Sequence, residues 1–127
     1  MIMNSCVFCK IVKGELPAYK IYEDEKYVAF LDIFPCCEGH TLVIPKKHVR
    51  WVWDYENLEE YFGVASKIAK HLRKVSGQEN VRLNVFGWDV PHAHIHLKPG
   101  RNDDWGCKKV DSEVLEKVRE KYRLVCS

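Results

Sequence analysis

Residues 92–98 read His-Ala-His-Ile-His-Leu-Lys, an unbroken alternation of polar and apolar side chains. A period of two is typical of a β-strand, because successive side chains of a strand point to opposite faces of the sheet. The three histidines and Lys98 therefore share one face, and Ala93, Ile95 and Leu97 share the other. We predict a strand over 92–98 whose apolar side packs on the core.

The three histidines of this strand favour a functional role. A solvated sheet face needs polar residues, but it does not need histidine in particular. A single metal ion shared by all three is excluded, because His92 and His96 start about 13 Å apart along a strand that rises about 3.3 Å per residue. Metal–nitrogen bonds are only about 2 Å long. We predict that one end of the strand serves structure or metal binding, and that the middle and far end serve chemistry.

A long amphipathic helix is predicted over residues 57–75, where apolar side chains recur at intervals of three and four. Asn57 and Glu60 have the spacing of a capping box, and Gly77 follows the last apolar position. The apolar stripe consists of Leu58, Phe62, Ala65, Ile68, Ala69, Leu72 and Val75.

The remaining segments predict further strands on both sides of this helix and a short helix near the C-terminus. Strands that precede and follow one long helix, with tight turns between neighbours, favour an α+β fold over a βαβ array. We expect an antiparallel sheet of about five strands. The other strands are predicted at 19–23, 27–32, 40–44, where Pro45 ends the strand, and 81–86, and the short helix at 111–122.

The composition indicates one soluble domain spanning residues 1–127. A chain of 127 residues with 46% apolar and 30% charged positions is long enough for one core and too short for two. The net charge of +2 argues against a nucleic-acid-binding surface, and no apolar run is long enough for a membrane span. Because the N-terminal residues MIMNSCVFCK carry no secretory signal, we predict a cytosolic protein with reduced thiols.

Cys6 and Cys9 form a C-x-x-C pair, a spacing that suits a zinc site or a redox pair. No thioredoxin-like βαβ pattern follows them, which favours zinc, and a redox pair or unused thiols remain the alternatives. The other cysteines form no second ligand set, and we interpret them as ordinary thiols: Cys36, Cys37, Cys107 and Cys126.

The heptapeptide HAHIHLK resembles the signature of the histidine triad (HIT) family, in which histidines alternate with apolar residues. Lys98 departs from it, because the last position is usually apolar. The segment CVFCKIVKGELPAYKIYEDEKYVAFLDIFPCCEGHTLVIPKKH also resembles the family's N-terminal half almost continuously. The resemblance covers about residues 6–98 and leaves 99–127 as a C-terminal extension. Trp105 and the last helix are candidates to cover either the substrate pocket or a dimer seam.

The resemblance implies a hydrolase or nucleotidyl transferase that acts on a purine nucleotide. His94 is then the nucleophile that attacks the α-phosphorus and forms a nucleotidyl-histidine intermediate, with its other ring nitrogen held by a backbone carbonyl. His96 and His40 line the phosphate pocket, and Asn84 reaches the phosphate or the surroundings of the nucleophile. The substrate would be a nucleoside phosphoramidate, a dinucleoside polyphosphate or a similar adenylylated compound.

The resemblance also implies a nucleotide-binding wall. Asp32 matches the carboxylate that accepts from the ribose hydroxyls, and a loop of the family that reads Gly-Gln-Ser/Thr-Val corresponds here to Gly87-Trp88-Asp89-Val90. Asp89 replaces a hydroxyl that helps the leaving group, so it serves either as a protonated acid or as a charge that disfavours an anionic substrate. Trp88 either caps the pocket or packs in the core. The slot for the base is matched by Phe8, Ile11, Phe30 and Ile33.

One branch of the family has a structural zinc site, and the matching ligands in this chain are Cys6, Cys9, His48 and His92. Four protein ligands leave no open position on the metal for catalysis. The family commonly forms two-fold dimers through the long helix and a strand edge. Two other functions compete with the enzyme: a nucleotide-binding regulator or scaffold with negligible turnover, and a zinc-binding interaction module without nucleotide affinity.

Overall fold

Five antiparallel strands form one open sheet in the order β1-β2-β3-β5-β4. A computed structural model describes residues 6–124, and Cys126 lies outside the described residues. The predicted α+β class with an antiparallel five-stranded sheet is confirmed. The elements in chain order are α1 (Val7–Val12), β1 (Lys20–Glu23), β2 (Tyr27–Leu31), β3 (Thr41–Pro45), the 3₁₀ helix η2 (Val52–Asp54), α2 (Leu58–Ser76), β4 (Val81–Asn84), β5 (Ile95–Pro99) and α3 (Ser112–Tyr122).

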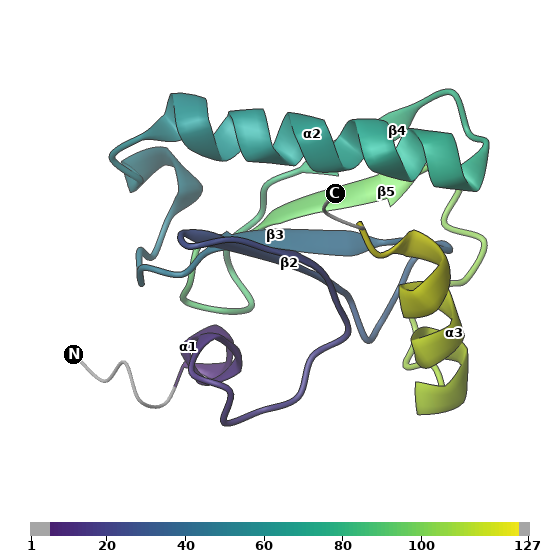
Figure 1. Cartoon of the computed structure of the whole chain (residues 1–127), viewed down its shortest axis with the longest axis horizontal. Coiled ribbons are helices and arrows are strands. Elements are labelled where there is room, and N and C mark those ends of the chain that lie inside the picture. The colour runs from purple at the N-terminus through teal and green to yellow at the C-terminus, as the bar shows by residue number, and fades with distance from the viewer. Residues whose placement is uncertain (1–5, 125–127) are drawn as a thin grey trace.

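The helices cover different sides of this sheet. Figure 1 shows α2 running along one face and α1 on the opposite face, while α3 stands at one end of the molecule beside α2. The chain thus has three layers over its central strands. Within residues 6–124 no helix is long and apolar enough to cross a membrane.

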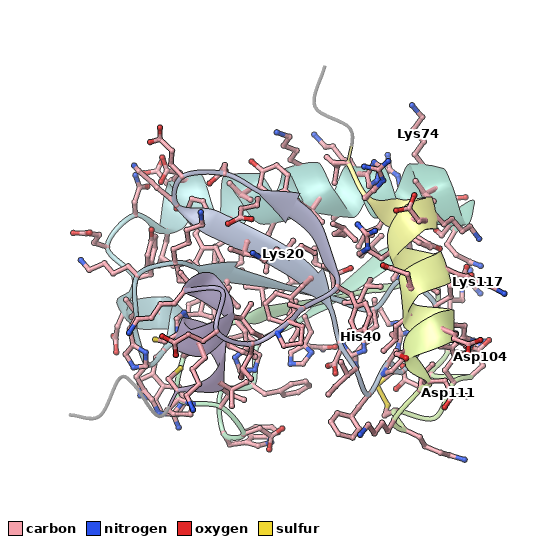
Figure 2. The ribbon with its side chains drawn as sticks, turned by 60° about the horizontal axis from the view of Figure 1, so that its bottom comes forward. Lys20, His40, Lys74, Asp104, Asp111 and Lys117 are labelled. Atoms are coloured by element: carbon pink, nitrogen blue, oxygen red, sulfur yellow. A yellow bond between two sulfur atoms is a disulfide. The ribbon has the colours of Figure 1, made fainter. Side chains whose placement is uncertain are left out.

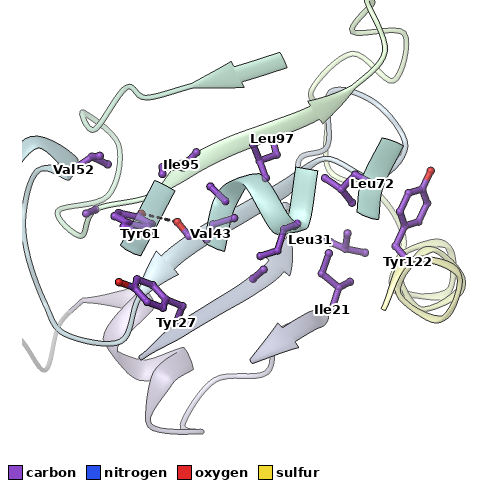
Figure 3. Close-up of a cluster of buried hydrophobic side chains, with 14 of the residues drawn as sticks. Ile21, Tyr27, Leu31, Val43, Val52, Tyr61, Leu72, Ile95, Leu97 and Tyr122 are labelled. Atoms are coloured by element: carbon purple, nitrogen blue, oxygen red, sulfur yellow. Dashed lines mark hydrogen bonds between the residues drawn. The ribbon is translucent and has the colours of Figure 1, made fainter. Parts of the chain in front are cut away.

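The main core lies between β5 and α2. Ala93, Ile95 and Leu97 are buried in it, as the alternation of 92–98 predicts. The Tyr61 hydroxyl donates to the Val43 carbonyl oxygen across 2.7 Å, so this buried polar group is satisfied within the core (Figure 3). Helix α2 contributes the buried residues Tyr61, Ala65, Ile68 and Leu72.

Both ends of α2 agree with the sequence prediction. The Asn57 side chain accepts a hydrogen bond from the Glu60 amide at 3.0 Å and satisfies one of the free amides of the first turn. At the other end Gly77 adopts φ +74°, a left-handed conformation that glycine reaches without a Cβ penalty, and its amide donates to the Arg73 carbonyl. These contacts stop the helix at both boundaries.

The opposite face of the sheet is also apolar at its centre. Strands β2 and β3 are buried along their whole length, because α1 packs against the side that α2 does not cover. Helix α1 has only six residues, fewer than the window in which a helical period can be recognised, so no pattern in the sequence predicts it. The second core cluster includes Phe8, Ile11, Val28, Phe30, Leu42 and Ile44.

The predicted strand over 92–98 is wrong at its start, since β5 begins only at Ile95. The His92 amide donates to the Val90 carbonyl at 2.8 Å and the Ala93 amide to the Val49 carbonyl at 2.6 Å. These bonds replace those of a strand ladder. His92 and His94 therefore lie on a bend that leads into the strand.

The last helix, α3, belongs to the core of the fold and contributes no residue to the pocket described below. Leu115, Val118 and Tyr122 of α3 are buried in the main core. The His71 ring also hydrogen-bonds the Tyr122 carbonyl and ties α2 to the end of α3 at 2.5 Å. The last helix was predicted to cover either the substrate pocket or a dimer seam. In the single chain it does not cover the pocket.

Candidate active site

A large pocket lies on the face of the sheet that carries His94, His96 and α1. Its cavity volume is about 840 Å³, which is in the range of small-molecule sites. Most of its wall is apolar, and a few polar groups converge at one end. These polar residues are Asp32, His40, Asp89, His94, His96 and Lys98.

His94 is held by a backbone carbonyl. Its Nδ1 lies 2.8 Å from the carbonyl oxygen of His92, and a carbonyl can only accept. In the neutral ring Nδ1 therefore carries the proton, and Nε2 keeps a free lone pair. The ring also packs edge-on against Phe8, with centroids 5.3 Å apart.

His40 and His96 form a directed pair. The Cys36 amide donates to Nδ1 of His40 at 3.0 Å, so the neutral His40 ring carries its proton on Nε2. That nitrogen lies 3.0 Å from Nδ1 of His96. His96 then accepts on Nδ1 and keeps its own proton on Nε2, where it can donate to a ligand.

Burial keeps both of these rings neutral. It lowers the pKa of His40 from 6.5 to about 3 and that of His96 to about 4, with smaller contributions from neighbouring cations. Near neutral pH the two rings are therefore hydrogen-bond donors and acceptors rather than positive charges. A bound anion would change this balance in favour of the protonated forms.

Asp32 lies at the same polar end of the pocket. Its Oδ1 accepts from the Phe34 amide at 2.9 Å, and its Oδ2 lies 3.6 Å from Nε2 of His40. Burial is the largest influence on this carboxyl and raises its pKa. Partly free acceptor oxygens at the rim of a pocket suit a ligand that brings hydroxyl groups.

The apolar wall contains all four residues predicted for the base slot. Phe8, Ile11 and Phe30 are buried, and the Phe8 and Phe30 rings meet edge to face at 5.4 Å. Ile33 is 43% exposed at the rim, so its apolar side chain is open to a ligand.

Contacts with Arg50 and Trp51 hold the loop over 87–90 in place. The Arg50 guanidinium donates to the carbonyl oxygens of Gly87 and Val90. Gly87 has φ +92°, and a Cβ there would approach the Trp51 ring to 2.6 Å, so no other residue fits without a shift. Asp89 and Val90 line the pocket from this loop.

Trp88 is at the mouth of the pocket and not in the core. Its side chain is 70% exposed, and its ring lies 4.9 Å from that of Phe86, which is also partly exposed. The interpretation of Trp88 as a pocket residue therefore fits its position, whereas the core interpretation was wrong.

Two predicted nucleotide-binding residues do not line the pocket. Asn84 is the register partner of His96 across β4 and β5, and Gly87 lies behind the loop against Trp51. The pocket also contains residues that the sequence analysis did not single out for binding. These include Val7, Leu16, Phe34, Phe86 and Lys98. Of these residues only Lys98 had a signal in the sequence, because it departs from the usually apolar last position of the family signature.

The four predicted metal ligands meet in one cluster. Their ligand atoms all lie within 4.8 Å of one another. The Cys9 Sγ is 3.1 Å from Nδ1 of His48 and 3.5 Å from Nδ1 of His92, and Cys6 Sγ is also 3.5 Å from the latter. Ligands at tetrahedral zinc are separated by about 3.6 Å for a sulfur and a nitrogen. The cluster therefore has a spacing that fits zinc.

A second contact prepares His92 for this arrangement. Its Nε2 lies 2.8 Å from the Pro45 carbonyl oxygen, so Nε2 carries the proton and Nδ1 presents its lone pair to the cluster. Such a backbone acceptor behind a histidine is typical of metal ligands. The cluster is consistent with zinc on both counts.

The expectation that all cysteines are reduced is wrong for one pair. Cys36 and Cys107 form a disulfide across 71 positions of the chain, drawn as a yellow bond in Figure 2. The Trp105 amide donates to the Cys36 carbonyl at 3.0 Å, which brings the two segments together. Sequence spacing alone does not reveal this contact. Cys6, Cys9 and Cys37 are free thiols.

Comparison with known proteins shows the family of this chain. The model of the HIT domain matches residues 13–103, and the chain belongs to the HIT domain family. The chain is 36% identical to the adenosine 5′-monophosphoramidase of Saccharomyces cerevisiae, a match that covers 91% of this chain and 79% of the relative. It is 41% identical to the "Protein hit" of Bacillus subtilis over 81% of this chain and 77% of that protein.

A solved structure agrees with the fold and is of a protein described as Zn-bound. A histidine triad family protein from Mycobacterium smegmatis, described as Zn-bound, has a TM-score of 0.82 and 34% identity to this chain. The match covers 94% of this chain and 91% of that one. The predicted membership of the HIT family and of its zinc-containing branch is thus supported.

Proposed function

We propose that this protein is a purine nucleotide hydrolase or nucleotidyl transferase that cleaves at the α-phosphorus through a nucleotidyl-His94 intermediate. The observation that carries the proposal is the bond from Nδ1 of His94 to the His92 carbonyl. It leaves Nε2 free for attack and lets the carbonyl stabilise the positive charge that the ring gains. The relatives named adenosine 5′-monophosphoramidase lead us to propose a nucleoside phosphoramidate as substrate, with a dinucleoside polyphosphate as the second class.

In the first step Nε2 of His94 bonds to the α-phosphorus, and the bond from phosphorus to the leaving amine breaks. The amine takes the electron pair, and a solvent water gives it a proton as it departs. In the second step water attacks phosphorus and releases a proton to solvent, the phosphorus–nitrogen bond breaks, and its electron pair returns to Nε2. We propose that His96 donates from Nε2 to a non-bridging oxygen while charge builds there. His40 would hold the His96 ring in place through its own hydrogen bond. Asn84, the register partner of His96, would act in the surroundings of the phosphate.

The rest of the nucleotide would occupy the walls described above. Asp32 would accept from the ribose hydroxyls. The base would lie between the apolar side chains, which bind an aromatic ring with little selectivity among bases. We assign the nucleotide to Phe8, Ile11, Phe30, Asp32 and Ile33, with Asp89 and Val90 facing the phosphate from their loop. Gly87 would contribute only through the shape of this loop.

Zinc at Cys6, Cys9, His48 and His92 would have a structural role, since four protein ligands close its coordination shell. It would join α1, which carries Phe8, to the bend that carries His94. The site thereby links the wall of the base slot to the nucleophile.

A homodimer is the proposed assembly. Strand β4 is an edge strand of the sheet, and Leu83 on it is 45% exposed. An unpaired edge with exposed apolar side chains is a surface on which a second copy can extend the sheet. Sedimentation equilibrium of wild type and Leu83→Lys tests this: a dimer that dissociates in the variant supports it, and a monomeric wild type refutes it.

The decisive experiment is mass spectrometry after brief incubation with adenosine 5′-phosphoramidate. Wild type should gain the mass of one adenylyl group, and His94→Ala should not. His71→Ala is the matched control, because His71 lies on α2 outside the pocket, and it should retain the adduct. If neither the adduct nor AMP release occurs while AMP still binds, the nucleotide-binding regulator or scaffold replaces the enzyme as the better proposal.

A further inference from the structure

Lys98 is a buried lysine in the wall of the pocket. It stands two positions after His96 on the same side of β5, and it is the register partner of Arg82 on β4. Its side chain is only 8% exposed, yet it lines the pocket together with His94 and His96. Lysines are seldom buried unless they are paired, so a partner for this ammonium is expected.

Within residues 6–124 no side chain forms a direct polar contact with this ammonium. Among the interactions of residues 6–124, Lys98 has no hydrogen bond and no carboxylate within ion-pair distance, and the Phe86 ring at 6.0 Å is its contact. Arg82, its neighbour across the sheet, is by contrast fully engaged with Gly100 and Asp103. No side-chain nitrogen of the described residues is both fully buried and without a hydrogen-bond partner, so the Lys98 ammonium reaches the open volume of the pocket. An anion that enters the pocket can therefore pair with this charge.

The ammonium lies 6.0 Å from the ring of Phe86, the residue that precedes the 87–90 loop. Its contact, Phe86, packs against His96 at 5.3 Å between centroids and against Trp88 at 4.9 Å. The apolar wall of Phe8 and Ile11 belongs to α1 on the other side of the histidines. An anionic group bonded to the α-phosphorus and directed toward Trp88 would therefore come close to Lys98.

We propose that Lys98 binds an anionic leaving group, namely a phosphate joined to the α-phosphate, and thereby extends the activity of the site from phosphoramidates with a neutral amine to phosphoanhydrides. The inference rests on the proposed function for its chemical step. In that step the bond from the α-phosphorus to the bridging oxygen breaks, and its electron pair stays on that oxygen as the bond from His94 Nε2 to phosphorus forms. The Lys98 ammonium neutralises the charge that the departing phosphate acquires.

The test compares Lys98→Met with wild type on two substrates, diadenosine tetraphosphate and adenosine 5′-phosphoramidate. Methionine keeps most of the length of the side chain at a position that is usually apolar in the family signature, so the variant should fold. We expect kcat/KM for the tetraphosphate to fall roughly 10- to 100-fold, the range for a lost charged hydrogen bond. The kcat/KM for the phosphoramidate should change by less than about threefold, which corresponds to much less free energy than one such hydrogen bond.

Two variants serve as controls. Lys98→Arg keeps the positive charge and should retain most of the tetraphosphate activity. Lys117→Met removes a lysine that is exposed on α3 (Figure 2) and should change neither substrate. An equal loss on both substrates, or no loss on either, would overturn the proposal.

A binding measurement separates this inference from the proposed function. Calorimetry with AMP and with ADP needs no turnover, and ADP adds the phosphate that Lys98 is proposed to bind. Wild type should prefer ADP to AMP by about tenfold, equivalent to one charged contact, and Lys98→Met should lose this preference. If wild type forms no adenylyl intermediate, the proposed catalysis fails, while a preference that disappears in the variant still supports the role of Lys98. An unchanged preference in the variant would refute that role even in an active enzyme.

Discussion

The Nε2 proton of His40 is directed at Nδ1 of His96 across 3.0 Å. Because the Cys36 amide occupies the other nitrogen of His40, the pair has a single direction of donation, from the backbone through two rings to the pocket. His40 thus positions His96 without contacting a ligand through its own donor.

We expect His40→Ala to lower kcat for adenosine 5′-phosphoramidate by about 10- to 100-fold, somewhat less than the loss of a direct oxyanion donor. KM should change little, because the donor matters most when charge builds on phosphorus. Steady-state kinetics measure both constants. A purely structural role would instead raise KM and lower the thermal midpoint together, and His40→Gln, which keeps a donor, should recover part of kcat.

Stability should fall in mild acid because of His40 and His96. Their pKa values in the folded state are about 3 and about 4, against 6.5 when unperturbed. Between these limits the unfolded chain binds protons that the folded chain does not, so stability is complete above pH 6.5 and is lost as the pH falls toward 4. At pH 5 the loss should be roughly 1 to 2 kcal/mol for each ring.

Urea unfolding at pH 7, 6 and 5 checks this prediction. The midpoint should decrease with pH in wild type and decrease less in His96→Asn. A midpoint that stays constant down to pH 5 would contradict it.

Removal of zinc should destabilise the fold. A structural zinc contributes more than about 2 kcal/mol, so a chelator should lower the thermal midpoint by roughly 8 °C. Elemental analysis should find one zinc per chain in wild type and none in Cys9→Ser. Cys37→Ser is the matched control, since Cys37 is a buried free thiol outside the cluster, and it should keep its zinc. A metal-free wild type with an unchanged midpoint would disprove the site.

Reduction of the Cys36–Cys107 disulfide should also cost stability. A bond that closes a loop of 71 positions is expected to contribute about 4 kcal/mol through the entropy of the unfolded chain. Urea unfolding with and without reductant measures the difference, and Cys107→Ser should behave as the reduced protein does. Peptide mapping without reductant that recovers only free Cys36 would show that the bond does not form in solution. Because the cytosol keeps thiols reduced, this result also bears on the predicted cytosolic location.

Asp89→Ser should strengthen AMP binding about two- to fivefold, because it removes a negative charge from the pocket. The gain is modest because solvent partly screens the repulsion between this carboxylate and the phosphate. Asp89 lines the pocket and is close enough to Asp32 to raise its pKa further. Calorimetry provides the affinities, and Asp104→Ser, on the surface away from this pocket, is the control (Figure 2). A loss of phosphoramidate turnover in Asp89→Ser would favour the alternative in which this carboxyl protonates the leaving group.

Local patterns in the sequence determined the elements of this fold. The stripe of α2 and its Asn57 cap set that helix, and the alternation through Ile95 and Leu97 set the buried side of β5. Such patterns are readable because the period of the backbone fixes which side chains share a face. The same patterns identified the histidines and the C-x-x-C pair as candidate functional residues. The family resemblance then implied the role of each residue.

Only the tertiary structure decided what those residues contact. The acceptors behind His92 and His94 are backbone carbonyls, and no side-chain pattern encodes where a carbonyl points. The bend before β5, the disulfide from Cys36 and the burial of Lys98 likewise depend on segments far apart in the chain. Long-range packing brings these groups together and removes them from water, and that desolvation sets the charge and the donor direction of each one.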